Sequence, residues 1–269
     1  MADVPLFSKW MYQGADTMNN KIKRVVVWFS AGVTSAVAAK MTIDKYKGVY
    51  PVRVVMCDTG SEHEDNARFT NEVSDYLGVN IEIIRNEKYT DTFDVYEKTR
   101  WLVGPKGARC SLELKKKPRQ RYERINSDLQ VFGFDFGEGD RALKFAINNP
   151  LVMWEFPLIK AAITKTEARQ MLASAGIAEP LTYQMGFDNA NCLARGCVKG
   201  GMGYWNHYRK IFPRRFDEMA RMEREIGAAI CKRYIDGERV AVYLDELPTD
   251  AGRHDGTGGF QCGLFCGEL

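Results

Sequence analysis

The feature that most constrains the fold is an apolar run that stops at a serine–glycine turn and continues as a helix of small residues. Residues 25–29 form the run, and the ten residues after it read SAGVTSAVAA. Within this turn Ser30, Thr34 and Ser35 offer hydroxyl groups, and Gly32 has no Cβ to block a ligand. The first N–H groups of a helix are unpaired and its amino end is positive, so the turn suits a phosphate or another anion. An ordinary strand–turn–helix crossover, whose hydroxyls merely cap the helix, is the alternative.

Two more apolar runs follow, at residues 52–57 and 81–84, with a predicted helix at 66–77 between them. Strands that alternate with helices predict an α/β fold built on a doubly wound, mainly parallel sheet. Ligands of such sheets bind beyond the carboxyl ends of the strands. The second run ends in the polar turn 58–62, so this turn lies at the same edge of the sheet as the serine turn. Two polar turns at one edge favour a binding site over a simple helix cap.

Four segments resemble one protein family. Residues 30–35 (SAGVTS) resemble the pyrophosphate loop S-G-G-x-D-S of the adenine nucleotide α-hydrolase-like superfamily. Residues 58–62 (DTGSE) resemble the D-T-G-x-E turn of its phosphoadenylyl-sulfate (PAPS) reductase branch. Residues 110–118 (CSLELKKKP) are similar to that branch's C-(S/T)-x-x-L-K-x-x-P, and residues 180–187 (PLTYQMGF) followed by Cys192 are similar to its P-x-x-Y-x-x-G-F…C. The four matches occur in the order of the family, from just before the first apolar run onward.

The resemblance implies an adenine-nucleotide site, with PAPS or ATP as the substrate. Lys115 falls on the lysine of the family motif and would neutralise sulfate or phosphate as a point charge. Asp58 and Glu62 would serve the adenosine end or the loop. The residues that this resemblance assigns to nucleotide binding are Ser30, Ala31, Gly32, Thr34, Ser35, Asp58, Thr59, Gly60, Glu62, Gly186 and Phe187.

Two departures from the loop pattern bear on the reaction. Thr34 stands where the ATP pyrophosphatases carry an aspartate, and Ala31 replaces the first glycine. Because magnesium prefers oxygen ligands, carboxylates among them, the change to threonine removes one candidate ligand. The loop therefore favours the sulfonucleotide branch over ATP cleavage.

The cysteines support a second hypothesis. Four residues separate Cys192 from Cys197, and three separate Cys262 from Cys266 in a glycine-rich tail. Two close pairs are typical of a four-thiolate site for zinc or an iron–sulfur cluster. Unrelated thiols are the simpler alternative. A third interpretation of the cysteines is catalysis, because residues 261–265 (QCGLF) resemble the E-C-G-L-H tail of PAPS reductases. In those enzymes the cysteine attacks the sulfate sulfur, and a redoxin supplies electrons.

Composition indicates a cytoplasmic enzyme. The net charge is +3, no run of 18 apolar residues is present, and seven cysteines without a secretory signal point to a reducing compartment. The basic stretch 109–124, a predicted helix interrupted near Pro118, reads as a solvated face or a nucleic-acid contact. A nucleic-acid partner and a homo-oligomer stay open, and a membrane partner is not expected.

We expect a loose arm at residues 1–20, a nucleotide-binding α/β domain at 21–190 and a cysteine-bearing C-terminal extension at 191–269. Smaller expectations are a helix that starts at Thr164 or Thr166 and another at 216–234. The leading function is sulfonucleotide reduction by a PAPS-reductase-like enzyme, with Lys115 and Cys262 as its catalytic residues. The alternatives are an ATP-dependent adenylylating sulfur transferase that acts on nucleic acid, and a nucleotide-binding protein without catalytic activity.

Overall fold

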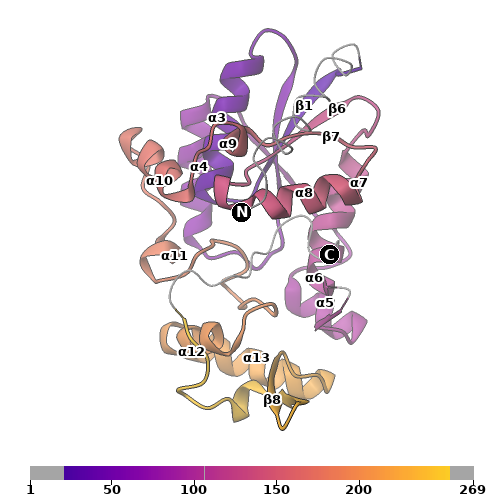
Figure 1. Cartoon of the computed structure of the whole chain (residues 1–269), viewed down its shortest axis with the longest axis vertical. Coiled ribbons are helices and arrows are strands. Elements are labelled where there is room, and N and C mark those ends of the chain that lie inside the picture. Colours follow the sequence, from indigo (N-terminus) through magenta and orange to yellow (C-terminus); the bar gives the residue numbers. More distant parts are fainter. Residues whose placement is uncertain (1–20, 106, 255–269) are drawn as a thin grey trace.

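A five-stranded parallel sheet forms the centre of the protein (Figure 1), in a computed structural model that describes residues 21–105 and 107–254. The strand order is β3–β2–β1–β6–β7, and every neighbouring pair runs parallel. The bounds are β1 Arg24–Phe29, β2 Val52–Cys57, β3 Ile81–Ile84, β6 Asp128–Phe132 and β7 Met153–Glu155. The predicted α/β fold is confirmed, and the three apolar runs are the strands β1, β2 and β3.

Burial explains why β1 reads as a continuous apolar run. It lies between β2 and β6, with Val27 opposite Val54 on one side and Val131 on the other. Helices cover both faces of the sheet, so every residue of β1 after Arg24 is buried. A strand covered on both faces has no solvent side, and its sequence therefore does not alternate between apolar and polar residues.

The two faces of the sheet carry different helices. On one face α3 (Val33–Tyr46), α4 (Asp65–Leu77), α9 (Pro157–Lys160) and α10 (Lys165–Ser174) enclose an aliphatic core. On the other face α8 (Gly139–Asn148) packs Phe145 against Phe132, with ring centroids 4.8 Å apart. Along the chain, the short α7 (Lys117–Tyr122) precedes β6, and the turn η2 (Phe136–Glu138) follows it.

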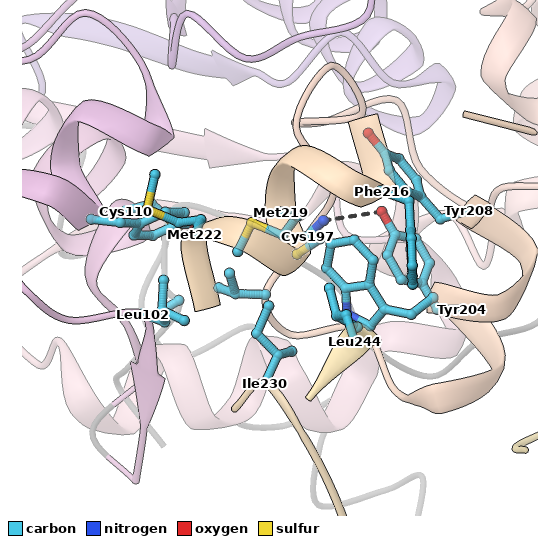
Figure 2. Close-up of a cluster of buried hydrophobic side chains, with 14 of the residues drawn as sticks. Leu102, Cys110, Cys197, Tyr204, Tyr208, Phe216, Met219, Met222, Ile230 and Leu244 are labelled. Atoms are coloured by element: carbon cyan, nitrogen blue, oxygen red, sulfur yellow. Dashed lines mark hydrogen bonds between the residues drawn. The ribbon is translucent and has the colours of Figure 1, made fainter. Parts of the chain in front are cut away.

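A second core lies away from the sheet, at the end of the molecule where Figure 1 labels α12, α13 and β8. Figure 2 shows part of it, including Cys110, Cys197, Tyr204 and Met219. Residues 89–114 and 187–247 both contribute to this core. Its elements are α5 (Thr92–Thr99), β4 (Val103–Gly104), β5 (Gly107–Ala108), α6 (Arg109–Ser111), η1 (Leu112–Lys116), α12 (Met202–Ile211), α13 (Pro213–Ile226), β8 (Cys231–Ile235), β9 (Glu238–Val242) and η3 (Leu244–Glu246). The short α11 (Leu181–Gln184) instead packs Tyr183 against the aliphatic core beside the sheet.

The expected helix at 216–234 is wrong in its second half. Helix α13 ends at Ile226, where Gly227 takes a left-handed conformation with φ 75°. Residues 231–235 instead form β8, which pairs antiparallel with β9 through a turn in which Asp236 and Gly237 both have positive φ. That is the backbone of a type I′ hairpin turn, for which Asp-Gly is a favoured sequence.

Two other local predictions are confirmed. Helix α10 starts after Thr164, whose hydroxyl accepts from the Glu167 backbone N–H while the Glu167 side chain accepts from the Thr164 N–H. The basic segment is interrupted before Pro118 by the π-helical turn η1. Proline lacks an N–H and its ring clashes with the carbonyl four residues earlier, so a wider turn relieves the contact. Within residues 21–105 and 107–254, no helix is both long and apolar enough to cross a lipid bilayer.

Candidate functional site

The candidate site is a pocket between the carboxyl ends of β1 and β6. From β1 the chain proceeds to β2 and β3 on one side of the sheet, while β6 and β7 lie on the other side. The gap between β1 and β6 is therefore the topological switch point, where open α/β sheets bind their ligands. A pocket of about 110 Å³ lies there. Its lining residues are Trp28, Ser30, Thr34, Ser35, Phe132, Gly133, Phe134, Asp135, Glu138, Arg141, Lys165, Tyr183, Asp188, Asn189, Ala190 and Asn191.

Ser35 shapes the serine loop from within. Its Oγ accepts from the backbone N–H of Ser30 at 3.1 Å and of Gly32 at 3.3 Å, and it donates to the Gly32 carbonyl at 2.8 Å. Ala31 is held in a left-handed conformation with φ 55°. Ser35 is buried, whereas Ser30 and Thr34 are half-buried and line the pocket. The hydroxyls of Ser30 and Thr34 are thus the ones placed to contact a ligand.

Two residues hold the loop against its surroundings. Gly133 follows β6 directly, and a Cβ there would lie 2.6 Å from the Ser35 Cα, so the strand end and α3 touch through backbone atoms. Tyr183 of α11 approaches from the other side, and its phenolic oxygen accepts from the Val33 N–H at the start of α3. Burial raises the pKa of Tyr183, so its hydroxyl stays neutral.

The charged side chains of the pocket come from segments after β6. Arg141 pairs with Glu138 at 2.6 Å, and burial raises the pKa of Glu138. Lys165 donates from Nζ to the backbone carbonyl of Asp188. Asp135 accepts from the Gly137 N–H at 2.8 Å. The motif matches missed all of these residues, and the available signal was their position just after a strand at the switch point.

The second polar turn stabilises itself. The Glu62 carboxylate accepts from the Thr59 hydroxyl at 2.7 Å and from the Thr59 and Ser61 N–H groups at 3.2 Å. Asp58 accepts from the Gly60 N–H at 2.7 Å and pairs with Arg85. Asp58 and Glu62 line a separate groove of about 530 Å³ beside α4, not the pocket between β1 and β6.

Lys115 lies close to this second turn. It sits in η1 with only 5% of its surface exposed. Burial raises the pKa of Glu62, and the positive charge of Lys115 opposes that shift; it likewise opposes the rise that burial causes in the pKa of Cys57. Lys115 is not among the residues that line the pocket.

Gly186 and Phe187 also lie outside the pocket lining. Gly186 has φ 83°, and its carbonyl lies 2.8 Å from His254 Nε2. The Phe187 ring is buried and contacts His207 at 4.8 Å and Phe212 at 6.0 Å between centroids. These contacts attach the turn to the second core.

Three cysteines gather around one buried tyrosine. Burial raises the pKa of Tyr96, and neighbouring Cys110, Cys197 and Cys192 raise it further. Cys192 also lies 3.5 Å from the Thr59 hydroxyl, so this thiol borders the second polar turn. The backbone N–H of Cys197 donates to the Tyr204 hydroxyl at 3.0 Å (Figure 2).

The sequence-based metal set did not include Cys110, and it did include Cys262 and Cys266, which lie outside the described residues. Within residues 21–105 and 107–254, no group of three or more His, Cys, Asp or Glu side chains is arranged to hold a metal ion. The shared cysteine site therefore stays a prediction.

Comparison with known proteins gives one family match. Residues 24–134 match the model of the phosphoadenosine phosphosulfate reductase domain. A comparison with curated proteins gives no match.

Two solved structures are similar. A PAPS reductase from Candida auris, in a phosphate complex, is 14% identical with a TM-score of 0.47, over 69% of this chain and 86% of that one. The U34-tRNA thiolase NcsA from Methanococcus maripaludis, with its 4Fe–4S cluster, is 17% identical with a TM-score of 0.45, over 87% and 84%. The family match runs from β1 to the residues just after β6, and β1 and β6 are the strands that flank the pocket. Residues 24–134 thus form a domain similar to the phosphoadenosine phosphosulfate reductase domain.

Proposed function

We propose that this protein binds an adenine nucleotide with the phosphate or sulfate end in the pocket between β1 and β6. The observation that carries the proposal is that the serine loop, the amino end of α3 and Lys165 meet in one pocket at the switch point. Hydroxyls, helix N–H groups and a cation are the groups that bind phosphate and sulfate in proteins. We keep Asp58, Thr59, Gly60 and Glu62 as the turn that serves the adenosine end.

For the reaction, we propose sulfonucleotide reduction first. In this reaction the Cys262 thiolate attacks the sulfur of the sulfonucleotide, forms an S–S bond and releases adenosine 3′,5′-bisphosphate. A redoxin dithiol then reduces the cysteine-bound group, releases sulfite and becomes a disulfide. Thr34 supports this reaction, because the loop lacks the carboxylate that would help bind magnesium.

One observation favours the adenylylating sulfur transferase as a second candidate. Asp135, Glu138 and Asp188 line the same pocket, and carboxylate oxygens are donors that magnesium prefers. These side chains would supply the acidic groups that the loop itself lacks. The nucleic acid target and the cluster of this alternative have no further support in the pocket.

Calorimetry tests the binding proposal. We expect wild-type protein to bind ATP or 3′,5′-adenosine bisphosphate, and Gly32→Val to weaken binding because the new side chain crowds Ser30 and the Tyr183 hydroxyl. Ser30→Ala should cost about 1 kcal/mol through a lost hydrogen bond. Ser174→Ala, which removes an exposed hydroxyl at the end of α10 that lines neither the pocket nor the groove beside α4, is the matched control and should bind normally. No heat with either nucleotide, or unchanged affinity in Gly32→Val, would contradict the proposal.

The same titrations in chelator and in magnesium separate the reactions. Tight binding of the bisphosphate in chelator, without ATP cleavage, supports the reductase. Magnesium-dependent conversion of ATP to AMP and pyrophosphate supports the transferase. Binding without turnover of PAPS or ATP supports a non-catalytic nucleotide-binding protein.

A further inference from the structure

We propose that Lys165 is the specificity-determining cation of the pocket, which transfers its hydrogen bond from the Asp188 carbonyl to the anionic end of the bound nucleotide. The inference rests on the proposed nucleotide site and adds a residue that neither the motifs nor the comparisons assign. The ligand class is a nucleotide with a terminal phosphate or sulfate.

The backbone of Lys165 is fixed from two sides. Helix α10 begins at this residue, and the reciprocal Thr164–Glu167 cap holds the helix start, with the Thr164 hydroxyl 2.7 Å from Glu167 Oε2. The carbonyl of Ile163 accepts from the Phe136 N–H at 2.9 Å, which ties the helix start to the segment after β6. These contacts therefore fix the position of the Lys165 backbone beside the pocket.

The side chain of Lys165 is aimed by Tyr183. Its Nζ lies over the Tyr183 ring, 5.0 Å from the centroid, and the Tyr183 hydroxyl in turn accepts from the Val33 N–H. One aromatic residue thus contacts both the cation and the amino end of α3. An anion bound at the loop would lie near both.

The ammonium group of Lys165 donates its hydrogen bond to a neutral partner. Its hydrogen bond goes to a backbone carbonyl, whereas Arg141, the other cation of the pocket lining, pairs with Glu138 and stacks on Phe134 at 4.8 Å. A buried ammonium gains more from a charged oxygen than from a carbonyl. Lys115, the lysine of the family motif, is outside this pocket lining.

The surroundings of Lys165 make its binding role sensitive to pH. Burial lowers the pKa of Lys165, and the positive charge of Arg169 lowers it further. The negative charges of Asp188, Asp135 and Glu138 act in the opposite direction. A bound anion favours the protonated amine, so affinity is full below the pKa of Lys165 and falls as pH rises through it. Because that pKa is lowered, the fall begins at a lower pH than for an exposed lysine. Tyr183 does not interfere, because burial raises its pKa.

The test is calorimetry with 3′,5′-adenosine bisphosphate from pH 7.5 to 10, where the phosphates are already ionised. At pH 7.5 we expect Lys165→Gln to bind about tenfold more weakly or worse, because a charge-assisted hydrogen bond is lost. Lys165→Arg keeps its charge at every pH tested, so it should bind within a few-fold of wild type and lose the alkaline decline. Lys160→Gln, an exposed lysine on the neighbouring α9, is the matched control and should behave as wild type.

Two failures are distinguishable. If wild-type protein binds no adenine nucleotide, the proposed function itself is wrong. If wild type binds and Gly32→Val does not, but Lys165→Gln keeps both the affinity and the pH profile of wild type, the Lys165 inference is overturned. Should Lys165→Gln fail to fold, the profile of Lys165→Arg decides, because a persistent alkaline decline there would assign the titration to another group.

Discussion

Glu223 is a buried carboxyl group that connects two parts of the second core. It is 0% exposed, and its carboxylate accepts from the Leu244 N–H at 2.6 Å and from the Ile230 N–H. Burial raises its pKa from 4.5 to about 7, although the two backbone N–H groups favour the charged form. Desolvation therefore outweighs hydrogen bonding at this residue.

This pKa predicts how stability depends on pH. Between about pH 4.5 and 7 the folded protein holds a proton on Glu223 that the unfolded chain releases, so the contribution of Glu223 to stability is present below this range and is lost as pH rises through it. The shift sets an upper limit of about 3 kcal/mol on the change. Urea unfolding of wild type and Glu223→Gln at pH 4.5 and 8 measures it: the advantage of wild type should shrink at pH 8. An equal difference at both values would show that Glu223 keeps its ordinary pKa.

At the residue scale, the sequence predicts only part of the pocket. Ser30, Thr34 and Ser35 are recognisable because strand, turn and helix follow one another directly. Lys165 and Asp188 enter the pocket from more than 100 residues further along the chain. A sequence read in short windows contains no signal for such long-range neighbours, so Lys165 was predicted only as part of a helix start.

At the element scale, the contact between β6 and α3 controls the shape of the pocket. We predict that Gly133→Ala costs about 1–3 kcal/mol, because its Cβ would lie 2.6–2.9 Å from α3 backbone atoms that cannot rotate away. The variant should also lose nucleotide affinity. Gly139→Ala, with no atom within 4 Å of the new Cβ, is the matched control and should be neutral or slightly stabilising. Thermal unfolding and calorimetry on both variants measure the effects, and a neutral Gly133→Ala would mean that strand and helix can separate freely.

The ends of helices and strands could be predicted where the sequence contains a local signal, such as a helix cap or a turn pair. The Thr164–Glu167 pair identifies the start of α10, and Gly176 marks its end. The expected helix at 216–234 extended an amphipathic pattern through Gly227 and gave too little weight to the Asp-Gly pair of the hairpin. The π-helical form of η1 has no comparable local signal, since the sequence indicates a break near Pro118 but not its geometry.

At the scale of the whole molecule, the sheet was predictable and the second core was not. Parallel strands buried on both faces leave long apolar runs, which are visible in any sequence. The second core instead joins residues 89–114 to residues 187–247, and the pattern of neither segment identifies the other. This core takes residues from both sides of the expected domain boundary near residue 190. The boundary itself stays a prediction.

The second core also sets the last prediction, which concerns the cysteines. Cys192 and Cys197 approach Tyr96 together with Cys110, and the predicted four-thiolate site joins Cys192 and Cys197 to Cys262 and Cys266. Thiolates around one metal centre contribute folding free energy, because the unfolded chain has no preformed site. After anaerobic purification, serine variants at Cys192, Cys197, Cys262 and Cys266 should therefore lose metal and thermal stability together.

Cys231→Ser is the matched control. This cysteine is equally buried, but its charged neighbour is Glu223, so its variant should lose stability without losing metal. Metal analysis, absorption spectra and melting curves measure both properties. The reductase reaction predicts another pattern, in which Cys262→Ser abolishes turnover while metal content and stability stay unchanged. Wild-type protein that carries neither zinc nor iron would contradict the shared site and leave Cys262 as a nucleophile that works alone.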